Sequence, residues 1–407
     1  MSAAPTATSE RAMIDDRIAR HNTRVLAAAQ ALGGAASPIV TSLGGIIGLA
    51  LSPDRGLATL PVSLVQLGVA LGTLPAAFVM RRLGRRNGYI LGALLGVTGG
   101  LVAAAGVTRG SFLAFCLGTL TTGLYIAYVQ SYRFAATDAA SPAFRARAIS
   151  WVMCGGLAAA IIGPQTVIWT RELVPGLLFT GTFLGQAALA LLTIVVVAFL
   201  KPTPFAPDAP RSGGRPLLEI VWQPRFAIAV AAGIVSFGLM SFLMTAAPVA
   251  MVECGHSVGI AALGIQWHVL GMFGPSFLTG RLIERYGKER VTAAGLVLIA
   301  AAAATGLSGL SIANFWFALV LLGLGWNLSF IGATALVTDC YRPEERAKVQ
   351  AANDFLVFGS VAVASFSSGK ILSVGGWESV NWLVFPPILV VLGLIAWQAQ
   401  RRIPAAA

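Results

Sequence analysis

Two pairs of soft or borderline metal ligands lie in strongly apolar segments near the middle of the chain. Met240 and Met244 form the first pair, and His268 and Met272 form the second. Each pair is four residues apart, so on a helix both side chains lie on one face, one turn apart. Thioether and imidazole ligands suit copper, above all Cu(I). The spacing therefore predicts a copper site, with packing by flexible apolar methionines as the alternative.

A second group of candidate ligands follows the first pair. Met251, Cys254 and His256 crowd the end of the same apolar segment. A thiolate binds Cu(I) strongly, so we expect this group to capture copper at the outer mouth of a transport path. The alternative is a polar helix end that contains one incidental cysteine.

Composition places these residues in a membrane. The chain has 407 residues, of which 57% are hydrophobic and only 11% are charged, and its mean hydropathy is +0.80. A soluble protein carries about 25% charged residues. The net charge of +12 is therefore not read as nucleic-acid binding, because Lys and Arg accumulate in the cytoplasmic loops of membrane proteins.

Twelve apolar stretches are each long enough to span a bilayer, which takes about 20 residues. The seventh and eighth, 224–253 and 258–283, carry the two ligand pairs near the middle of the membrane. The sequence predicts an all-α protein with this organisation: cytoplasmic tail 1–23, six-helix bundle 24–200, cytoplasmic linker 201–223, six-helix bundle 224–400 and cytoplasmic tail 401–407.

Charge asymmetry gives the orientation. With both termini on one side, that side holds 24 of the 28 Lys and Arg residues, and the other keeps only Arg55, Arg109, Arg171 and Lys370. The positive-inside rule then makes both termini cytoplasmic.

The two halves repeat in sequence. Gly84, in the basic loop after the second stretch, corresponds to Gly287 at an offset of 203, and Asp138 corresponds to Asp339 at an offset of 201. Each aspartate is followed at the same spacing by an arginine, Arg145 in one half and Arg346 in the other. Two matches in the same order indicate a duplicated six-helix unit.

These loops resemble those of the major facilitator superfamily, whose signature between helices two and three is roughly G-x-x-x-D-R-x-G-R-R. The second half carries Gly280, Glu284, Arg285 and Gly287, whereas the first half has Ala77 in place of the leading glycine and Arg81 in place of the acid. The resemblance covers nearly the whole chain and implies two pseudo-symmetric bundles that work by alternating access. The residues it assigns to loop or gating roles are Arg82, Gly84, Arg85, Gly280, Glu284, Arg285, Gly287, Asp138, Arg145, Asp339 and Arg346.

The MxxxM and HxxxM motifs on helices seven and eight further resemble those of CcoA-like copper importers within this superfamily. That resemblance implies that Met240, Met244, His268 and Met272 bind copper during its import across the bacterial inner membrane. The copper would supply haem-copper oxidase assembly, and a cytoplasmic copper chaperone or export ATPase would be a partner. The alternatives are a proton-coupled efflux antiporter for small amphipathic molecules and a copper-binding membrane sensor that does not transport.

Other polar residues within the spans complete the sequence picture. Gln30, Gln66, Gln130, Gln165 and Asn327 are expected to line the cavity or to form hydrogen bonds between helices, and Asp354 lies near the cytoplasmic start of helix eleven. The sequence shows no nucleophile–base constellation, phosphate loop or nucleotide motif. We therefore expect a transporter rather than an enzyme, with copper as substrate and no organic cofactor.

Overall fold

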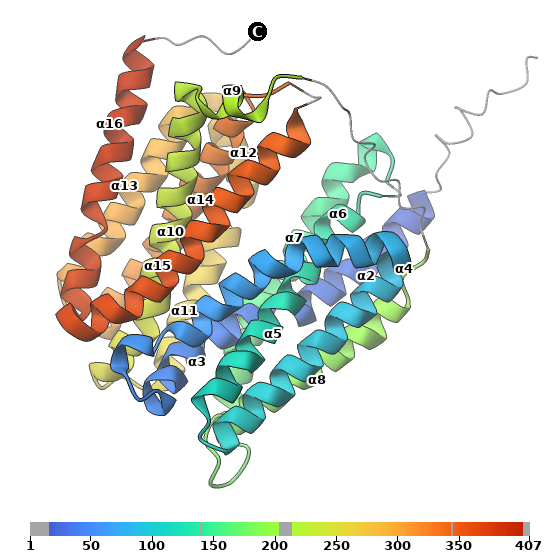
Figure 1. The fold of residues 1–407 in the computed structure, drawn as a ribbon, viewed down its shortest axis with the longest axis vertical. Helices are drawn as coiled ribbons and strands as arrows, with labels where there is room; N and C mark the ends of the chain where they lie inside the picture. The colour runs from blue at the N-terminus through green and yellow to red at the C-terminus, as the bar shows by residue number, and fades with distance from the viewer. Residues whose placement is uncertain (1–15, 139, 203–213, 343–344, 402–407) are drawn as a thin grey trace, which may run out of the picture.

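The computed structural model describes residues 16–138, 140–202, 214–342 and 345–401. Figure 1 shows two bundles of helices side by side, one from each half of the chain. The N-terminal half contains α2 (Asp16–Gly33), α3 (Ala36–Leu51), η1 (Arg55–Leu57), α4 (Leu60–Thr108), α5 (Phe112–Gln130), α6 (Tyr132–Ala135), α7 (Pro142–Thr170) and α8 (Thr180–Ala198). The short α9 (Leu217–Val221) precedes the C-terminal half, which contains α10 (Pro224–Glu253), α11 (Val258–Phe273), α12 (Ser276–Tyr286), α13 (Lys288–Leu307), α14 (Ile312–Val337), α15 (Arg346–Trp382) and α16 (Phe385–Arg401).

The helical stretches account for twelve membrane crossings. In the described part of the chain, nine stretches are long and apolar enough to span, and the bent pair α11–α12 adds a tenth. Two of the nine, of 54 and 53 residues, are each about 80 Å of helix at 1.5 Å per residue, far more than a bilayer core of about 30 Å. Each of these two folds back and crosses twice, so the all-α prediction with twelve crossings is confirmed.

Glycines with left-handed backbone mark where the long stretches turn. Gly84 has φ +78° inside α4, and Gly376 has φ +67° inside α15. A Cβ atom on Gly88 would lie only 2.7 Å from Met80 Cγ, so the two arms of α4 meet just beyond the turn. A side chain with a Cβ atom is strained at positive φ, which explains glycine at the turning points.

Two predicted bounds need correction on the N-terminal side and in the linker. The first helix already includes 16–23, which were assigned to the tail, because polar side chains there are tied to the end of the sixth crossing. Asn22 donates to the carbonyl of Lys201 and accepts from its N–H, both at 3.0 Å. The linker 201–223 contains α9, and its residues 203–213, like residues 1–15 and 402–407, lie outside the described part.

The eighth crossing is broken, although the sequence predicted one helix over 258–283. The axes of its two parts, Val258–Phe273 and Leu278–Tyr286, differ by 48°. Pro275 lies at the break, where its ring cannot continue a straight helix. The bend separates the outer segment, which carries His268, from the cytoplasmic one.

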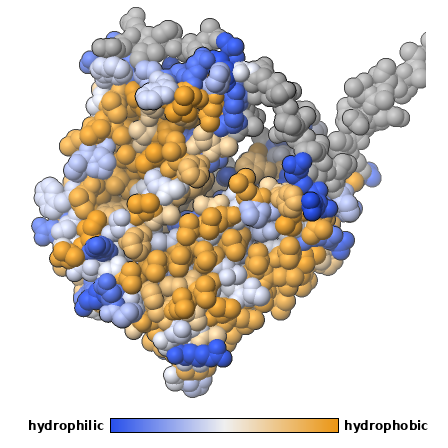
Figure 2. All heavy atoms as spheres, in the orientation of Figure 1, coloured by the Kyte–Doolittle hydropathy of each residue, from blue (hydrophilic) through white to orange (hydrophobic). Residues whose placement is uncertain are grey.

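Each half has its own apolar core, and the outside of the molecule is also apolar. Leu74, Trp169, Phe355 and Val374 are among the large side chains that are mostly exposed. Figure 2 shows apolar surface over the flanks of both halves, with polar residues gathered toward the ends. A surface of this kind is stable only in lipid, which confirms a multi-pass membrane protein.

The two halves touch mainly at the end away from the chain termini. There α3 packs on α10 and α11, α7 packs on α11, and α15 packs on α4 and η1. Toward the end that carries α9 and the C-terminus the ribbons diverge, and the surface between them is hollowed (Figures 1 and 2). By the positive-inside rule this hollow end is cytoplasmic.

Candidate functional site

The four predicted copper ligands lie in the core of the C-terminal half. Met240, Met244, Met272 and His268 are all buried, the last with no exposed surface. Nδ1–H of His268 donates to the carbonyl of Leu319 on α14 at 2.8 Å, so the imidazole faces α14. Although α10 and α11 are joined by a short loop, α11 packs chiefly on α14 and α7. The helices α10 and α11 do contact each other, and Met240, Met244 and Met272 share one apolar core, but the His268 imidazole is directed to α14.

The second group of predicted ligands lies at the outer end of α10 and in the turn that follows it. Met251 is fully buried, Cys254 is exposed and His256 is partly buried. Nε2–H of His256 donates to the carbonyl of Leu310 at 2.8 Å. Burial, with a smaller contribution from the Glu253 carboxylate, raises the pKa of the Cys254 thiol and so disfavours the thiolate. Among the described residues, no three or more His, Cys, Asp or Glu side chains are grouped to hold a metal.

The repeated loop residues form the same construction in each half. Gly84 (φ +78°, ψ 165°) and Gly287 (φ +87°, ψ 156°) have nearly the same backbone conformation. The basic residue after each glycine pairs with the equivalent aspartate: Arg85 with Asp138 at 2.8 Å, and Lys288 with Asp339 at 2.5 Å.

Arg145, which follows Asp138 at the repeated spacing, is not its ion-pair partner. Arg145 instead directs Nε–H to the carbonyl of Ala140 at 3.3 Å, and Arg225 adds a second cation on Asp339 at 2.8 Å. The side chain of Arg346 lies outside the described part. Ion pairs of these aspartates thus brace the loops, but with residues that the sequence spacing did not indicate.

The remaining loop residues lie at the cytoplasmic surface. Arg82 stacks its guanidinium on Phe78 at 4.3 Å, and Arg285 stacks on Tyr286 at 5.3 Å. Glu284 is exposed, and a Cβ atom on Gly280 would meet open space. Their positions suit an interface with water and lipid headgroups.

Polar contacts between the halves close the outer end. The hydroxyl of Ser365 on α15 lies 3.1 Å from those of Ser63 on α4 and Thr245 on α10. Nearer the surface, Arg55 pairs with Glu253. The Ser63–Ser365 and Arg55–Glu253 contacts join the two halves, with partners 302 and 198 residues apart in the chain, whereas Thr245 and Ser365, 120 residues apart, both belong to the C-terminal half.

Two of the amides expected in the spans make helix-to-helix hydrogen bonds. Gln165 on α7 donates to Gln266 on α11 at 3.0 Å and so joins the halves. Asn327 on α14 donates to the Met272 carbonyl and to Ser276 Oγ at 2.8 Å within the C-terminal half. The prediction of inter-helix hydrogen bonds is confirmed for these two residues.

An aromatic cluster, which the sequence argument missed, lies between α10, α14 and α15. Phe237 on α10 is its hub, with ring centroids 5.1 to 5.6 Å from those of Phe330, Trp326 and Phe358. Trp326 and Phe330 are stacked at 5.2 Å with planes 14° apart, and Phe273 contacts Trp326 at 6.1 Å. We call these five residues the aromatic cluster.

Depth places the cluster near the middle of the membrane. Phe237, Phe358 and Trp326 lie 11 to 13 residues from the cytoplasmic ends of α10, α15 and α14. This corresponds to about 17–20 Å of helix at 1.5 Å per residue. Transport sites occur at this depth between two repeats.

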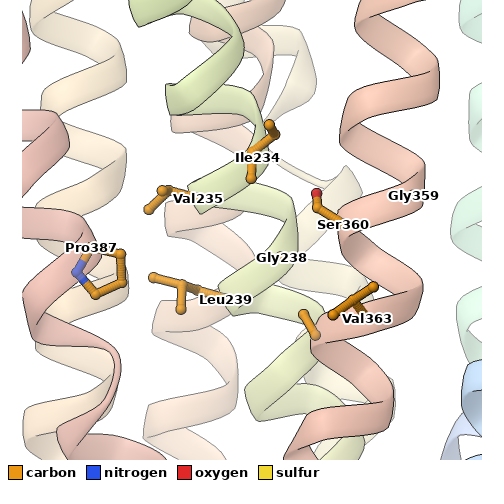
Figure 3. Close-up of a pocket in the computed structure, with 9 residues that line it drawn as sticks. Ile234, Val235, Gly238, Leu239, Gly359, Ser360, Val363 and Pro387 are labelled. Carbon is orange, nitrogen blue, oxygen red and sulfur yellow. The ribbon is translucent and has the colours of Figure 1, made fainter.

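The faces of α10 and α15 that do not carry the aromatic cluster line an apolar groove of about 410 Å³. This groove opens between α10, α15 and α16. Figure 3 shows Ile234, Val235 and Leu239 in this groove, with Pro387 across it. At 100° per residue, Phe237 points about 130° away from the groove-facing residues of α10, and Phe358 about 170° away from those of α15. The aromatic cluster therefore lies on the side of α10 and α15 that is turned away from the groove.

The cluster can hold a flat, apolar ring. Phe237, Phe330 and Phe358 are only partly buried, so their ring faces offer stacking surfaces. Trp326 Nε1–H is buried without a hydrogen-bond partner among the described residues, which leaves a donor for a polar edge. Stacking on such rings is worth about 1–3 kcal/mol for a nucleic-acid base.

The cluster was missed because its members are far apart in sequence. Only Trp326 and Phe330 share a helical face by spacing, and such a pair is common in apolar helices. The available signal was the presence of aromatic residues at equal depth on helices seven, ten and eleven.

Two six-helix halves, closed outside and hollowed on the cytoplasmic side around a mid-membrane site, define a secondary transporter. The chain belongs to the Major Facilitator Superfamily, whose family model matches residues 25–277 and 268–406. The fold is similar to that of the E. coli xylose transporter XylE, with a TM-score of 0.68 at 12% identity over 95% of this chain and 98% of that one. It is also similar to the nucleoside transporter NupG, with a TM-score of 0.71 at 16% identity over 93% and 99% of the two chains.

A relative in sequence is the riboflavin transporter RfnT of Brucella anthropi, which is 60% identical over 382 residues, 93% of this chain and 96% of that protein. This similarity overturns the copper-importer assignment, because a relative this similar over its full length carries an organic substrate. The efflux and copper-sensor alternatives gain no support from it. The predictions of a transporter rather than an enzyme, and of an inner-membrane location, are confirmed.

Proposed function

We propose that this protein transports riboflavin across the bacterial inner membrane by alternating access. The observation that carries the proposal is the 60% identity to a riboflavin transporter over 93% of the chain. Similarity of this extent includes the helices on which all five cluster residues lie.

The chemistry of the aromatic cluster supports the same substrate. Riboflavin consists of a flat tricyclic isoalloxazine ring and a hydroxylated ribityl chain, and it carries no net charge at neutral pH. A flat ring of this size gains dispersion and stacking energy between Phe237, Phe330 and Phe358. The unpartnered Nε1–H of Trp326 is a donor for a ring carbonyl.

The test is riboflavin uptake into proteoliposomes, followed by the fluorescence of the vitamin itself. Wild-type protein is expected to carry riboflavin in excess of protein-free liposomes. Trp326→Ala should lower uptake by about tenfold or more, since stacking is worth about 1–3 kcal/mol, and Trp326→Phe should retain part of it. Trp169→Ala is the matched control, because Trp169 is 75% exposed on the outside of the helices.

Wild-type liposomes that accumulate no more riboflavin than protein-free ones would overturn the proposal. Equal uptake by Trp326→Ala and wild type would be consistent with riboflavin transport but would show that the aromatic cluster does not contribute to it.

A further inference from the structure

Asp354 lies directly below the aromatic cluster on the cytoplasmic side. It precedes Phe358 by four residues on α15, so the two side chains share a face and stand about one turn, or 6 Å, apart. Asp354 is exposed, and the Asn353 amide donates to its Oδ1 at 3.1 Å. A charged side chain at this depth within a span is unusual and points to function.

A cation from the other half is near enough to interact electrostatically with this carboxylate. Arg133, on α6 at the cytoplasmic end of helix four, and Asp354 attract each other electrostatically. The guanidinium of Arg133 is also held over the ring of Phe134, 4.8 Å from its centroid. Because α6 belongs to the N-terminal half and α15 to the C-terminal half, the two charged groups border the same space between the halves.

Together with the aromatic cluster, these groups form a surface that changes from apolar to charged toward the cytoplasm. The Phe358 ring lies deeper, the Asp354 carboxylate lies one helical turn closer to the cytoplasm, and Arg133 adds a donor from the cytoplasmic end of helix four. A carboxylate accepts hydrogen bonds from hydroxyl groups, and a guanidinium donates to them, and charged partners make both kinds of bond stronger than neutral ones.

We infer that Asp354 and Arg133 bind the polyhydroxyl chain of a substrate whose planar ring stacks on the aromatic cluster. This inference rests on the proposed function and adds the orientation of the substrate, ring inward and hydroxyl chain toward the cytoplasm. The ribityl chain is attached directly to the isoalloxazine ring, so it reaches the next helical turn when the ring is stacked.

The test compares two flavins that share the ring. Lumiflavin carries a methyl group where riboflavin carries the ribityl chain. Binding of each to detergent-purified full-length protein is measured from the quenching of flavin fluorescence. Asp354→Asn and Arg133→Gln should each weaken riboflavin binding by about tenfold, while lumiflavin binding should stay within about twofold of wild type.

Glu378→Gln is the matched control, because Glu378 is an exposed carboxylate at the opposite end of the same helix. It should change neither Kd. Retained lumiflavin binding also shows that a variant is folded, and Arg133→Gln tests the inference independently if Asp354→Asn does not fold.

Two results would overturn the inference. One is an equal loss of both flavins in the two variants, which would indicate a general effect on the site. The other is unchanged riboflavin binding. If the wild type binds riboflavin, neither result contradicts the proposed riboflavin transport. A wild type that binds neither flavin would contradict the proposed function itself.

Discussion

The carboxylate of Asp138 accepts two hydrogen bonds from the guanidinium of Arg85, at 2.8 and 3.2 Å. Arg85 directly follows the left-handed Gly84, and Asp138 lies just beyond the end of helix four. Burial raises the pKa of Asp138, and the bonds from Arg85 act in the opposite direction. The pair fastens the hairpin between helices two and three to helix four, and Lys288 and Asp339 repeat it in the other half.

Breaking this bond is expected to slow transport more than it weakens substrate binding. Asp138→Asn removes a charged partner of the partly buried Arg85, and hydrogen bonds to charged groups are worth about 1.5–3 kcal/mol. We expect riboflavin uptake to fall by about tenfold, with the Kd for riboflavin within about threefold of wild type.

The exchange of charges is the control for this prediction. The double variant Arg85→Asp, Asp138→Arg should recover part of the lost uptake. A double variant as slow as Asp138→Asn would show that the loss of uptake does not come from breaking the ion pair.

The outer closure should depend on buried hydroxyls more than on the surface ion pair. Ser365 is fully buried between Ser63 and Thr245, whereas the side chain of Arg55 is 69% exposed. Exposed ion pairs contribute about 0–1 kcal/mol, and a buried hydrogen-bond partner costs more to remove. Ser365→Val should therefore open the outer end more often than Arg55→Gln.

Labelling from outside measures that opening. Ala246 has no exposed surface, so Ala246→Cys, in protein whose four native cysteines are replaced, should react slowly with an impermeant maleimide. Adding Ser365→Val should speed the reaction at least several-fold, and adding Arg55→Gln should speed it less. The reverse order would contradict the argument from burial.

Glu345 should stabilise the C-terminal half at neutral pH. Its buried carboxylate accepts hydrogen bonds from Nε and Nη2 of Arg215 at 3.0 and 2.9 Å, and from two backbone N–H groups. The Arg215 side chain, opposed by burial and aided by the backbone N–H groups, lowers the pKa of Glu345 from 4.5 to about 2. Glu345→Gln should lower the free energy of unfolding by about 2 kcal/mol.

The pH dependence follows from the direction of that shift. Because the pKa is lower in the folded protein, the stabilisation is present above about pH 4.5 and is lost as the pH falls toward 2. Thermal unfolding in detergent should thus show a gap between wild type and variant that narrows in acid. Glu219→Gln on the exposed face of α9 should leave the melting temperature unchanged, and a pH-independent gap would contradict this account.

The methionines first considered as copper ligands are expected to act by packing. Met240 and Met244 are 1% and 7% exposed within the apolar core. Met→Leu replacements usually cost less than about 1.5 kcal/mol. Met240→Leu and Met244→Leu should each keep riboflavin uptake within about twofold of wild type, and a tenfold loss would show a specific need for sulfur.

His268 is expected to matter for stability. Its Nδ1–H bond to the Leu319 carbonyl joins α11 to α14 without exposure to water. His268→Leu leaves that carbonyl without its partner, so the free energy of unfolding should fall by about 1–3 kcal/mol. A variant that melts at the wild-type temperature would contradict this structural role.

Local signals in the sequence were sufficient to predict the transporter architecture. Apolar runs of fixed length, the bias of Lys and Arg to one side and the repeated Gly84 and Gly287 loops each depend on short segments and on the bilayer. The broken eighth crossing could also have been expected from Pro275.

The residues that form the site could not be predicted from such local signals. A four-residue spacing establishes that Met240 and Met244, or His268 and Met272, share a helical face, but not what that face meets. In the folded chain His268 meets α14, and Phe237, Trp326 and Phe358 come into contact from three helices far apart in sequence.

The sequence by itself determined how many times this chain crosses the membrane, which end is cytoplasmic and that its halves are copies. Only the tertiary structure decided which side chains face each other between those halves. The reason is physical: hydrophobicity fixes each helix in the bilayer independently, whereas its rotation about its own axis depends on packing against neighbours distant in sequence.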